Sequence, residues 1–176
     1  MAKSTPEPLL PVVTLRRASL ADLPVLMTQR RAMFNEMKIT TPRRVAASLR
    51  PFEQWLHPLL RSGRCRAWLV ESEGKPVAGA TAWIPDWPPN PRDRTDRAGY
   101  VMNVYTDPGF RGRGLATRLV QTCMDWLRSR GIRRVTLHAS VQGRPIYERM
   151  GFKTTNEMRV FLPASHRPIR SRSSKS

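Results

Sequence analysis

Three closely spaced glycines, Gly109, Gly112 and Gly114, are the feature of this sequence that points most directly to chemistry. They follow an apolar, strand-like run over residues 100–105. They precede a helical run over residues 115–129, whose apolar residues recur at spacings of three and four. Glycine leaves backbone N–H groups uncovered, and the N-terminal end of a helix carries a partial positive charge. The pattern therefore predicts a turn that binds a phosphate group through its backbone.

Two common phosphate-binding loops do not match this turn. A P-loop requires a lysine and then a serine or threonine after the last glycine, and Leu115 and Ala116 occupy those positions. A dinucleotide-binding loop requires a third small residue where Thr117 stands, and an acid at the end of the next strand. That strand, expected over residues 134–140, ends in His-Ala-Ser. The turn therefore belongs to neither scheme.

The segments around the turn alternate between strand and helix patterns. Strands are expected over residues 12–16, 64–71, 76–84, 100–105 and 134–140, with a terminal hairpin from 152–154 and 157–162. Helices are expected over residues 20–37, from residue 42 in short pieces broken at Pro51 and Pro58, over 115–129 and over 145–150. A strand–helix–strand crossover implies a parallel pair. The sequence thus predicts a single α/β domain, with a mixed, mostly antiparallel twisted sheet, one parallel β–α–β crossover and flanking helices.

Length and composition bound the organisation of the chain. The 176 residues suffice for one domain with a real core, which we place at residues 12–162. Residues 1–11 are expected to form a flexible lead-in, and residues 163–176 a basic disordered tail. No apolar run is long enough to span a membrane, and the N-terminus lacks the apolar stretch of a secretory signal. We therefore expect a cytoplasmic protein with no membrane partner.

Cysteine and histidine give no sign of a metal site. Cys65 and Cys123 lie far apart and are expected to be two buried thiols in a reducing compartment. His57, His138 and His166 share no ligand spacing. We therefore expect no bound metal.

The net charge of +18 is the strongest compositional signal. The last fourteen residues contribute four basic side chains and no acid, and further arginines cluster between residues 111 and 134. Such a field attracts polyanions, so an acidic or nucleic-acid partner is one expectation. An alternative reading of the chain is accordingly a basic nucleic-acid or ribosome-associated binding module without catalysis.

Three segments together resemble one enzyme family. The first is Arg-x-x-Gly-x-Ala over residues 111–116, directly after a strand that ends at residues 104–108. The second is the run over residues 138–152, in which Tyr147 precedes x-x-x-Gly-Phe. The third comprises residues 15–18 and 30–34 in the N-terminal half. The chain resembles the GNAT acetyltransferase superfamily over residues 12–162.

The resemblance implies an acetyl-CoA-dependent N-acetyltransferase, which transfers an acetyl group to a primary amine by direct attack in a ternary complex. The residues that it implies for acetyl-CoA binding are Val104, Tyr105, Thr106, Arg111, Gly112, Arg113, Gly114, Leu115, Ala116, Thr117, Ser140 and Tyr147. It implies two catalytic groups. The Val104 N–H would polarise the acetyl carbonyl, and Tyr147 would protonate the departing thiolate.

The chain departs from the family pattern at two positions. Ser140 stands where many members carry an asparagine that contacts CoA, and Val135 stands where some carry a glutamate base. The general base is therefore open between Glu36, Asp86, His138 and a chain of waters.

The acceptor and the assembly state are also left open by the sequence. The aromatic and acidic residues Trp83, Asp86 and Trp87 are expected near the acceptor and would suit a cationic amine. A second copy of the chain, forming a homodimer, is one of the partners considered.

Overall fold

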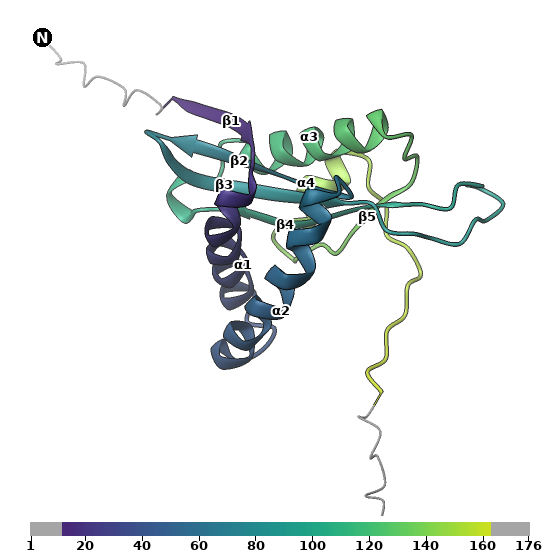
Figure 1. Cartoon of the computed structure of the whole chain (residues 1–176), viewed down its shortest axis with the longest axis horizontal. Helices are drawn as coiled ribbons and strands as arrows, with labels where there is room; N and C mark the ends of the chain where they lie inside the picture. The colour runs from purple at the N-terminus through teal and green to yellow at the C-terminus, as the bar shows by residue number, and fades with distance from the viewer. Residues whose placement is uncertain (1–11, 163–176) are drawn as a thin grey trace, which may run out of the picture.

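A five-stranded sheet in the order β1-β2-β3-β4-β5 forms the centre of the molecule (Figure 1). The computed structural model describes residues 12–162, so the predictions for residues 1–11 and 163–176 lie outside this range. The strands are β1 Val13–Arg17, β2 Cys65–Ser72, β3 Lys75–Trp83, β4 Gly99–Thr106 and β5 Val135–Leu137. The helices are η1 Leu20–Asp22, α1 Leu23–Met37, α2 Pro42–Arg61, η2 Pro108–Phe110, α3 Leu115–Ser129 and α4 Arg144–Arg149.

Strand pairing confirms the predicted α/β class. β1 through β4 pair antiparallel in sequence order, and β4 pairs with β5 in parallel. The connection between that parallel pair contains α3, which is the expected crossover helix. The hairpin between β2 and β3 turns through Glu73 and Gly74, both of which have the positive φ of a two-residue hairpin turn.

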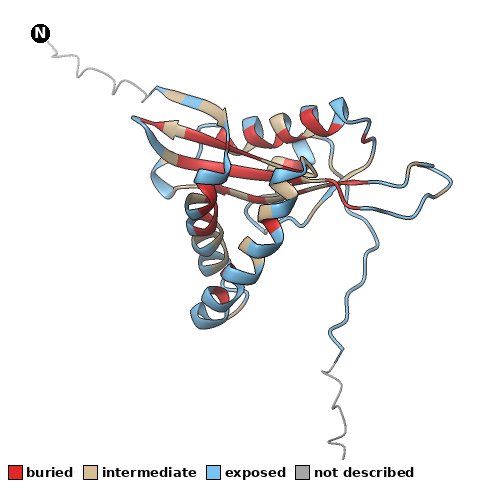
Figure 2. Ribbon diagram, viewed as in Figure 1, coloured by how far each residue is buried: buried red, intermediate tan, exposed pale blue. Residues whose placement is uncertain are grey.

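Helices cover both faces of the sheet, and alternate residues of β2 show how. Trp68 and Val70 belong to a core cluster with the apolar side of α3, whereas Ala67 and Leu69 pack with α1 and α2. Successive side chains of a strand point to opposite faces, so the near-continuous apolar run of β2 fits burial on both sides. Figure 2 shows the resulting buried band along the central strands.

Two details of the sequence prediction are wrong. The first concerns α2, which runs unbroken through Pro51 and Pro58. Each proline removes one backbone hydrogen bond and normally kinks a helix. Val45, Leu49 and Leu56 are nevertheless buried along one side of α2. Burial of this apolar stripe offsets the local cost, because most helical stability in proteins comes from tertiary packing.

The second error is the terminal hairpin, since residues 152–162 contain no strand. This segment runs extended past the end of β5 and is exposed almost throughout (Figures 1 and 2). Period-two apolar alternation predicts a strand only if a neighbouring strand supplies the hydrogen bonds. β5 is the nearest edge and has just three residues, so it offers little for a terminal strand to pair with.

The strand β4 carries the irregularity that opens the site. Thr81 pairs with Met102 and Gly79 pairs with Tyr105, so β4 has one residue more than β3 between these two pairs. Asn103 lies in this bulge with a φ of 53°, a conformation that non-glycine residues rarely adopt. On the other side, β5 stops pairing at Val101. The C-terminal half of β4 therefore leaves its parallel neighbour and borders open space.

No helix in the described part of the chain has the length and apolar character needed to cross a membrane. Cys65 and Cys123 are both buried free thiols, and burial raises the pKa of the Cys65 thiol to about 12. Within residues 12–162, no three His, Cys, Asp or Glu side chains gather closely enough to hold a metal ion.

Candidate active site

A pocket of about 730 Å³ lies where β4 and β5 separate. This volume is within the range of small-molecule and cofactor sites. The side chains and backbone that line it come from the following segments: Arg30, Met33, Phe34, Glu36 and Met37 of α1; Phe52 of α2; residues 100–106 of β4; Phe110, Arg111, Gly112 and Gly114; Leu115, Ala116 and Thr117 of α3; Leu137, His138, Ser140, Gln142 and Gly143; and Ile146, Tyr147 and Arg149 of α4. Eleven of the twelve residues expected to bind acetyl-CoA are among them, and Arg113 is not.

The glycine turn forms one end of this pocket. Gly112 and Gly114 have φ values of 75° and 73°, which only glycine adopts without strain. Gly114 is the N-cap of α3 and provides no capping side chain, and the first turn of α3 contains no acid. A Cβ added at either glycine would meet nothing within 4 Å. The first N–H groups of α3 therefore have no capping side chain, which fits the binding of a pyrophosphate group.

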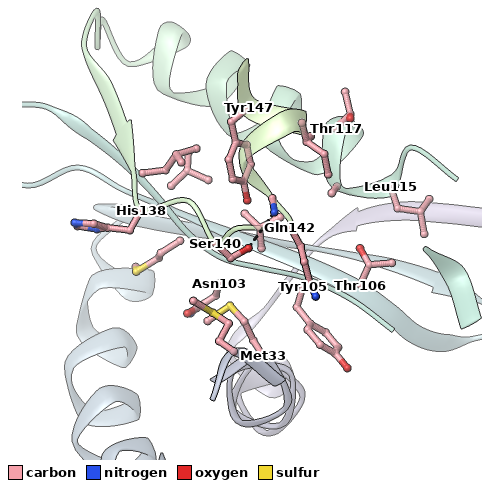
Figure 3. Close-up of a pocket in the computed structure, with 18 of the residues that line it drawn as sticks. Met33, Asn103, Tyr105, Thr106, Leu115, Thr117, His138, Ser140, Gln142 and Tyr147 are labelled. Carbon is pink, nitrogen blue, oxygen red and sulfur yellow. Dashed lines mark hydrogen bonds between the residues drawn. The ribbon is translucent and has the colours of Figure 1, made fainter. Parts of the chain in front are cut away.

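Tyr147 reaches the pocket from the opposite side, on α4. Its side chain is 9% exposed and packs edge-on against Phe152. Gly143 allows this close approach, because a Cβ there would lie 3.0 Å from the tyrosine ring. Figure 3 shows the hydroxyl pointing toward the loop that carries Ser140 and Gln142. Burial raises the pKa of Tyr147, so the phenol keeps its proton beyond its ordinary range.

Ser140 has a local structural contact as well as a place in the pocket lining. Its Oγ accepts a hydrogen bond from the Gly143 N–H at 3.0 Å, and its backbone oxygen accepts one from the Arg144 N–H at 3.0 Å. The hydroxyl therefore holds the loop that leads into α4. The serine side chain is long enough for this hydrogen bond, because the Gly143 N–H is only three residues along the chain.

Arg111 is held by the protein itself. Its Nε donates to the backbone oxygen of Thr106 at 2.9 Å, and its Nη2 pairs with Glu36 Oε2 at 2.5 Å. The hydroxyl of Tyr105 donates to the other oxygen of Glu36 at 3.2 Å. Burial and the Glu36 charge raise the pKa of Tyr105 to about 12. Arg113, whose Nη2 donates to the Gly109 oxygen at 3.1 Å, is likewise engaged in the turn.

The three candidate bases differ in position. Glu36 is the one carboxylate among the described residues that line the pocket, and Arg111 and Tyr105 occupy both of its oxygens. His138 lies at the pocket margin, with one ring nitrogen bonded to the Tyr100 hydroxyl. In Figure 3 its side chain points away from the centre of the pocket.

Asp86 does not line the pocket. Its side chain is 80% exposed and pairs with Arg64 at 2.9 Å. Trp83 and Trp87, which the sequence suggested for the acceptor, are also outside the pocket lining. Trp83 instead packs against Trp55 at a centroid distance of 4.9 Å, in the layer between α2 and the sheet.

Arg30 and Asn103 are two polar residues of the pocket that the sequence prediction did not assign to the site. Arg30 Nη1 donates to Asn103 Oδ1 at 2.5 Å, across 73 positions of the chain. A signal was present in the sequence, because Arg30 stands within the apolar stripe of the first helix. A charged residue on a stripe that faces the core needs a polar partner or a ligand. Asn103 gave no comparable signal, since its bulge conformation depends on the pairing of β4 with β3.

The arrangement of a splayed parallel strand pair, a glycine turn at a helix N-terminus and a buried tyrosine is that of an acyl-CoA-dependent transferase fold. The family model described as "Acetyltransferase (GNAT) family" matches residues 30–152. The chain therefore belongs to the GNAT acetyltransferase family.

Two crystal structures are similar over most of the chain. A GCN5-related N-acetyltransferase from Ralstonia eutropha JMP134 is 35% identical with a TM-score of 0.82, over 86% of this chain and 99% of that one. A predicted acetyltransferase with acetyl-CoA from Clostridium acetobutylicum is 27% identical with a TM-score of 0.78, over 86% and 96%.

The curated relatives match over a shorter part. The mycothiol acetyltransferase of Beutenbergia cavernae is 34% identical over 107 residues, which is 59% of this chain and 32% of that protein. The chain covers 32%, 42% and 44% of the length of three curated relatives, so it spans less than half of each.

Proposed function

We propose that the protein is an acetyl-CoA-dependent N-acetyltransferase that acetylates a primary amine by direct attack, with residues 12–162 as its catalytic domain. One observation carries the proposal. The pocket between β4 and β5 has uncapped backbone donors of the glycine turn at one end and the Tyr147 hydroxyl at its side. The complex of the Clostridium relative with acetyl-CoA supports the identity of the donor.

The donor would lie along the C-terminal half of β4. The backbone N–H groups between Gly112 and Thr117 would bind its pyrophosphate, and Ser140 would border the pantetheine arm. Residues 104–106 would pair with that arm as a sheet edge pairs with an added strand, because β5 ends before this level. Arg111 would contribute positive charge at the turn while remaining paired with Glu36.

The chemical step would use two groups of this chain. The neutral amine attacks the thioester carbonyl, a C–N bond forms and the C–S bond breaks. The Val104 N–H, next to the bulge, would stabilise the negative charge on the carbonyl oxygen. Tyr147 would donate its proton to the leaving sulfur, because its raised pKa keeps the phenol protonated at neutral pH. We assign the proton lost by the amine to water, because Glu36 is already engaged with Arg111 and Tyr105.

The base assignment has a direct test. The test measures kcat/KM as a function of pH for the wild type and Glu36→Gln. If Glu36 is not the base, the fall in kcat/KM at low pH should be the same in both proteins. Loss of this fall in Glu36→Gln, with acetyl-CoA binding intact, would make Glu36 the base instead.

We also propose a homodimer in which residues 158–162 pair with a second copy. Met158, Val160, Phe161 and Leu162 are 76–95% exposed on one short extended segment. Within the described residues, this segment has no strand partner, and β5 is an open edge with a groove beside it. A strand donated by another copy would cover both.

Light scattering during size-exclusion chromatography tests the homodimer. We expect twice the monomer mass for the wild-type chain and a monomer for the double variant Val160→Glu, Phe161→Glu. Replacing Arg43, an exposed residue of α2 that does not line this groove, with glutamine should leave the dimer in place. A wild-type monomer at all concentrations would contradict the proposal.

A further inference from the structure

Arg30 is one of the charged side chains of the pocket that the proposed chemistry does not use. It lies on α1 with its guanidinium between two phenyl rings, 4.5 Å from the centroid of Phe34 and 3.7 Å from that of Phe52. Its one side-chain hydrogen bond within residues 12–162 goes to Asn103. The rings and Asn103 fix the orientation of the guanidinium, so its position at the pocket wall is defined.

The positive charge of Arg30 has no counter-ion in the described part of the chain. Its guanidinium forms no ion pair there, and Glu36, the carboxylate of the pocket lining, is paired with Arg111. Burial lowers the pKa of Arg30 to about 10, and the nearby Tyr100 opposes this shift only in part. A partly buried charge without an ion-pair partner has lost part of its hydration, which a bound anion would compensate.

Two hydrogen-bond donors at this place also lack acceptors. Arg30 Nε and Asn103 Nδ2 are both buried, and neither has a partner among residues 12–162. They belong to side chains that already touch each other, so they lie in one small region. Both atoms are enclosed by the protein, so an anion in the pocket would bind the guanidinium through Nη2 instead. Nη2 is not among the enclosed atoms and donates no hydrogen bond within residues 12–162.

The location of this pair indicates which ligand would supply the anion. Asn103 directly precedes Val104, whose N–H we assign to the acetyl carbonyl. The glycine turn follows β4 beyond Thr106, at the other end of the same strand stretch. The donor's phosphates therefore have their own site, and Arg30 lies on the side of the reaction centre that remains for the acceptor. In Figure 3, Asn103 and Met33 lie across the pocket from Tyr147.

We infer that Arg30 and Asn103 form a subsite for an anionic group, a carboxylate or a phosphate, on the acceptor amine. This inference rests on the proposed acetyltransferase function and specifies its substrate class. It also opposes the cationic acceptor that Trp83, Asp86 and Trp87 suggested from the sequence, because an unpaired guanidinium repels a second cationic group. The acceptor would be an amine that carries its negative charge a short distance from the nitrogen.

Matched acceptor pairs test the subsite. Glycine and glycinamide differ in a carboxylate, and O-phosphoethanolamine and ethanolamine differ in a phosphate. Release of CoA at saturating acetyl-CoA would be measured for the wild type, Arg30→Gln and Arg31→Gln. Arg31 is the exposed neighbour on α1 and does not line the pocket, so it controls for the loss of one positive charge.

We expect kcat/KM to favour the anionic member of at least one pair by about tenfold or more in the wild type and in Arg31→Gln. In Arg30→Gln that preference should disappear, through a higher KM for the anionic amine. The pair that shows the preference identifies the anion as carboxylate or phosphate. Equal use of both members by the wild type, or an unchanged preference in Arg30→Gln, would overturn the inference.

A binding measurement covers the case in which none of the four amines is acetylated. Inorganic phosphate or acetate should raise the Tm of the wild-type complex with CoA, and should not raise that of Arg30→Gln. No difference between the two proteins would overturn the subsite. If Arg30→Gln folds poorly, Arg30→Lys replaces it in the test. Because lysine keeps the charge, Arg30→Lys should retain part of the rise in Tm. Failure of the proposed function would look different, since then no variant would bind acetyl-CoA.

Discussion

Replacement of Tyr147 with phenylalanine is expected to lower kcat by about 10²- to 10⁴-fold, the contribution typical of a general acid. The ring packs against Phe152 and is largely buried, and phenylalanine preserves this packing. The substitution removes only the hydroxyl. Figure 3 shows this hydroxyl on the pocket side of the ring. The affinity for acetyl-CoA should therefore change little, which calorimetry measures separately from turnover.

The pH dependence of the wild type supplies an independent readout for Tyr147. Because burial raises its pKa above the ordinary 10.0, the phenol remains a proton donor throughout the neutral and mildly alkaline range. We expect the alkaline fall in kcat to come at a higher pH than the ordinary phenol pKa would give. If Tyr147→Phe instead weakened acetyl-CoA binding and left kcat unchanged, Tyr147 would be a binding residue and not the acid.

Replacement of Gly114 with alanine should weaken acetyl-CoA binding by about tenfold or more. The new methyl group would stand in open space at a residue that lines the pocket, beside the N–H groups to which we assign the pyrophosphate. The φ of 73° at this position also strains any residue with a Cβ, which costs about 1–2 kcal/mol of folding stability. Calorimetry with acetyl-CoA and thermal unfolding measure the two effects.

Gly131 offers a matched control at the other end of α3. Its φ is 76°, an added Cβ there also meets nothing within 4 Å, and it does not line the pocket. Gly131→Ala should therefore lower the Tm about as much as Gly114→Ala does, yet leave acetyl-CoA binding intact. Equal loss of binding in both variants would mean that strain in α3, and not occupation of the cradle, is responsible.

The strands and helices that frame the site could be predicted because their signals are local. The apolar stripe of α3, the glycines before it and the turn at Gly74 each depend on residues close in sequence. Pro51 and Pro58 misled the prediction of α2, since they are also local signals and the packing that outweighs them is not. The terminal hairpin failed for the same reason, because its alternation says nothing about whether a partner strand is present.

The contacts inside the site could not be predicted from the sequence, because they join residues far apart in the chain. Glu36 was a candidate base, and its pairing with Arg111 joins residues 75 positions apart. The contact between Arg30 and Asn103 spans 73 positions and depends on a bulge in β4. No periodicity or motif encodes either distance. Both contacts are consequences of how α1 crosses the face of the sheet, and they set the charge available to the acceptor.

Titration of the protein with acetyl-CoA by calorimetry tests the central claim most directly. We predict saturable binding to one site per chain, with Gly114→Ala weakened and Gly131→Ala unchanged, and release of CoA when a suitable amine is added. Absence of detectable binding at millimolar acetyl-CoA would contradict the proposed function. Binding of RNA with a steep salt dependence in the same preparation would then favour a basic binding module that retains the fold without catalysis.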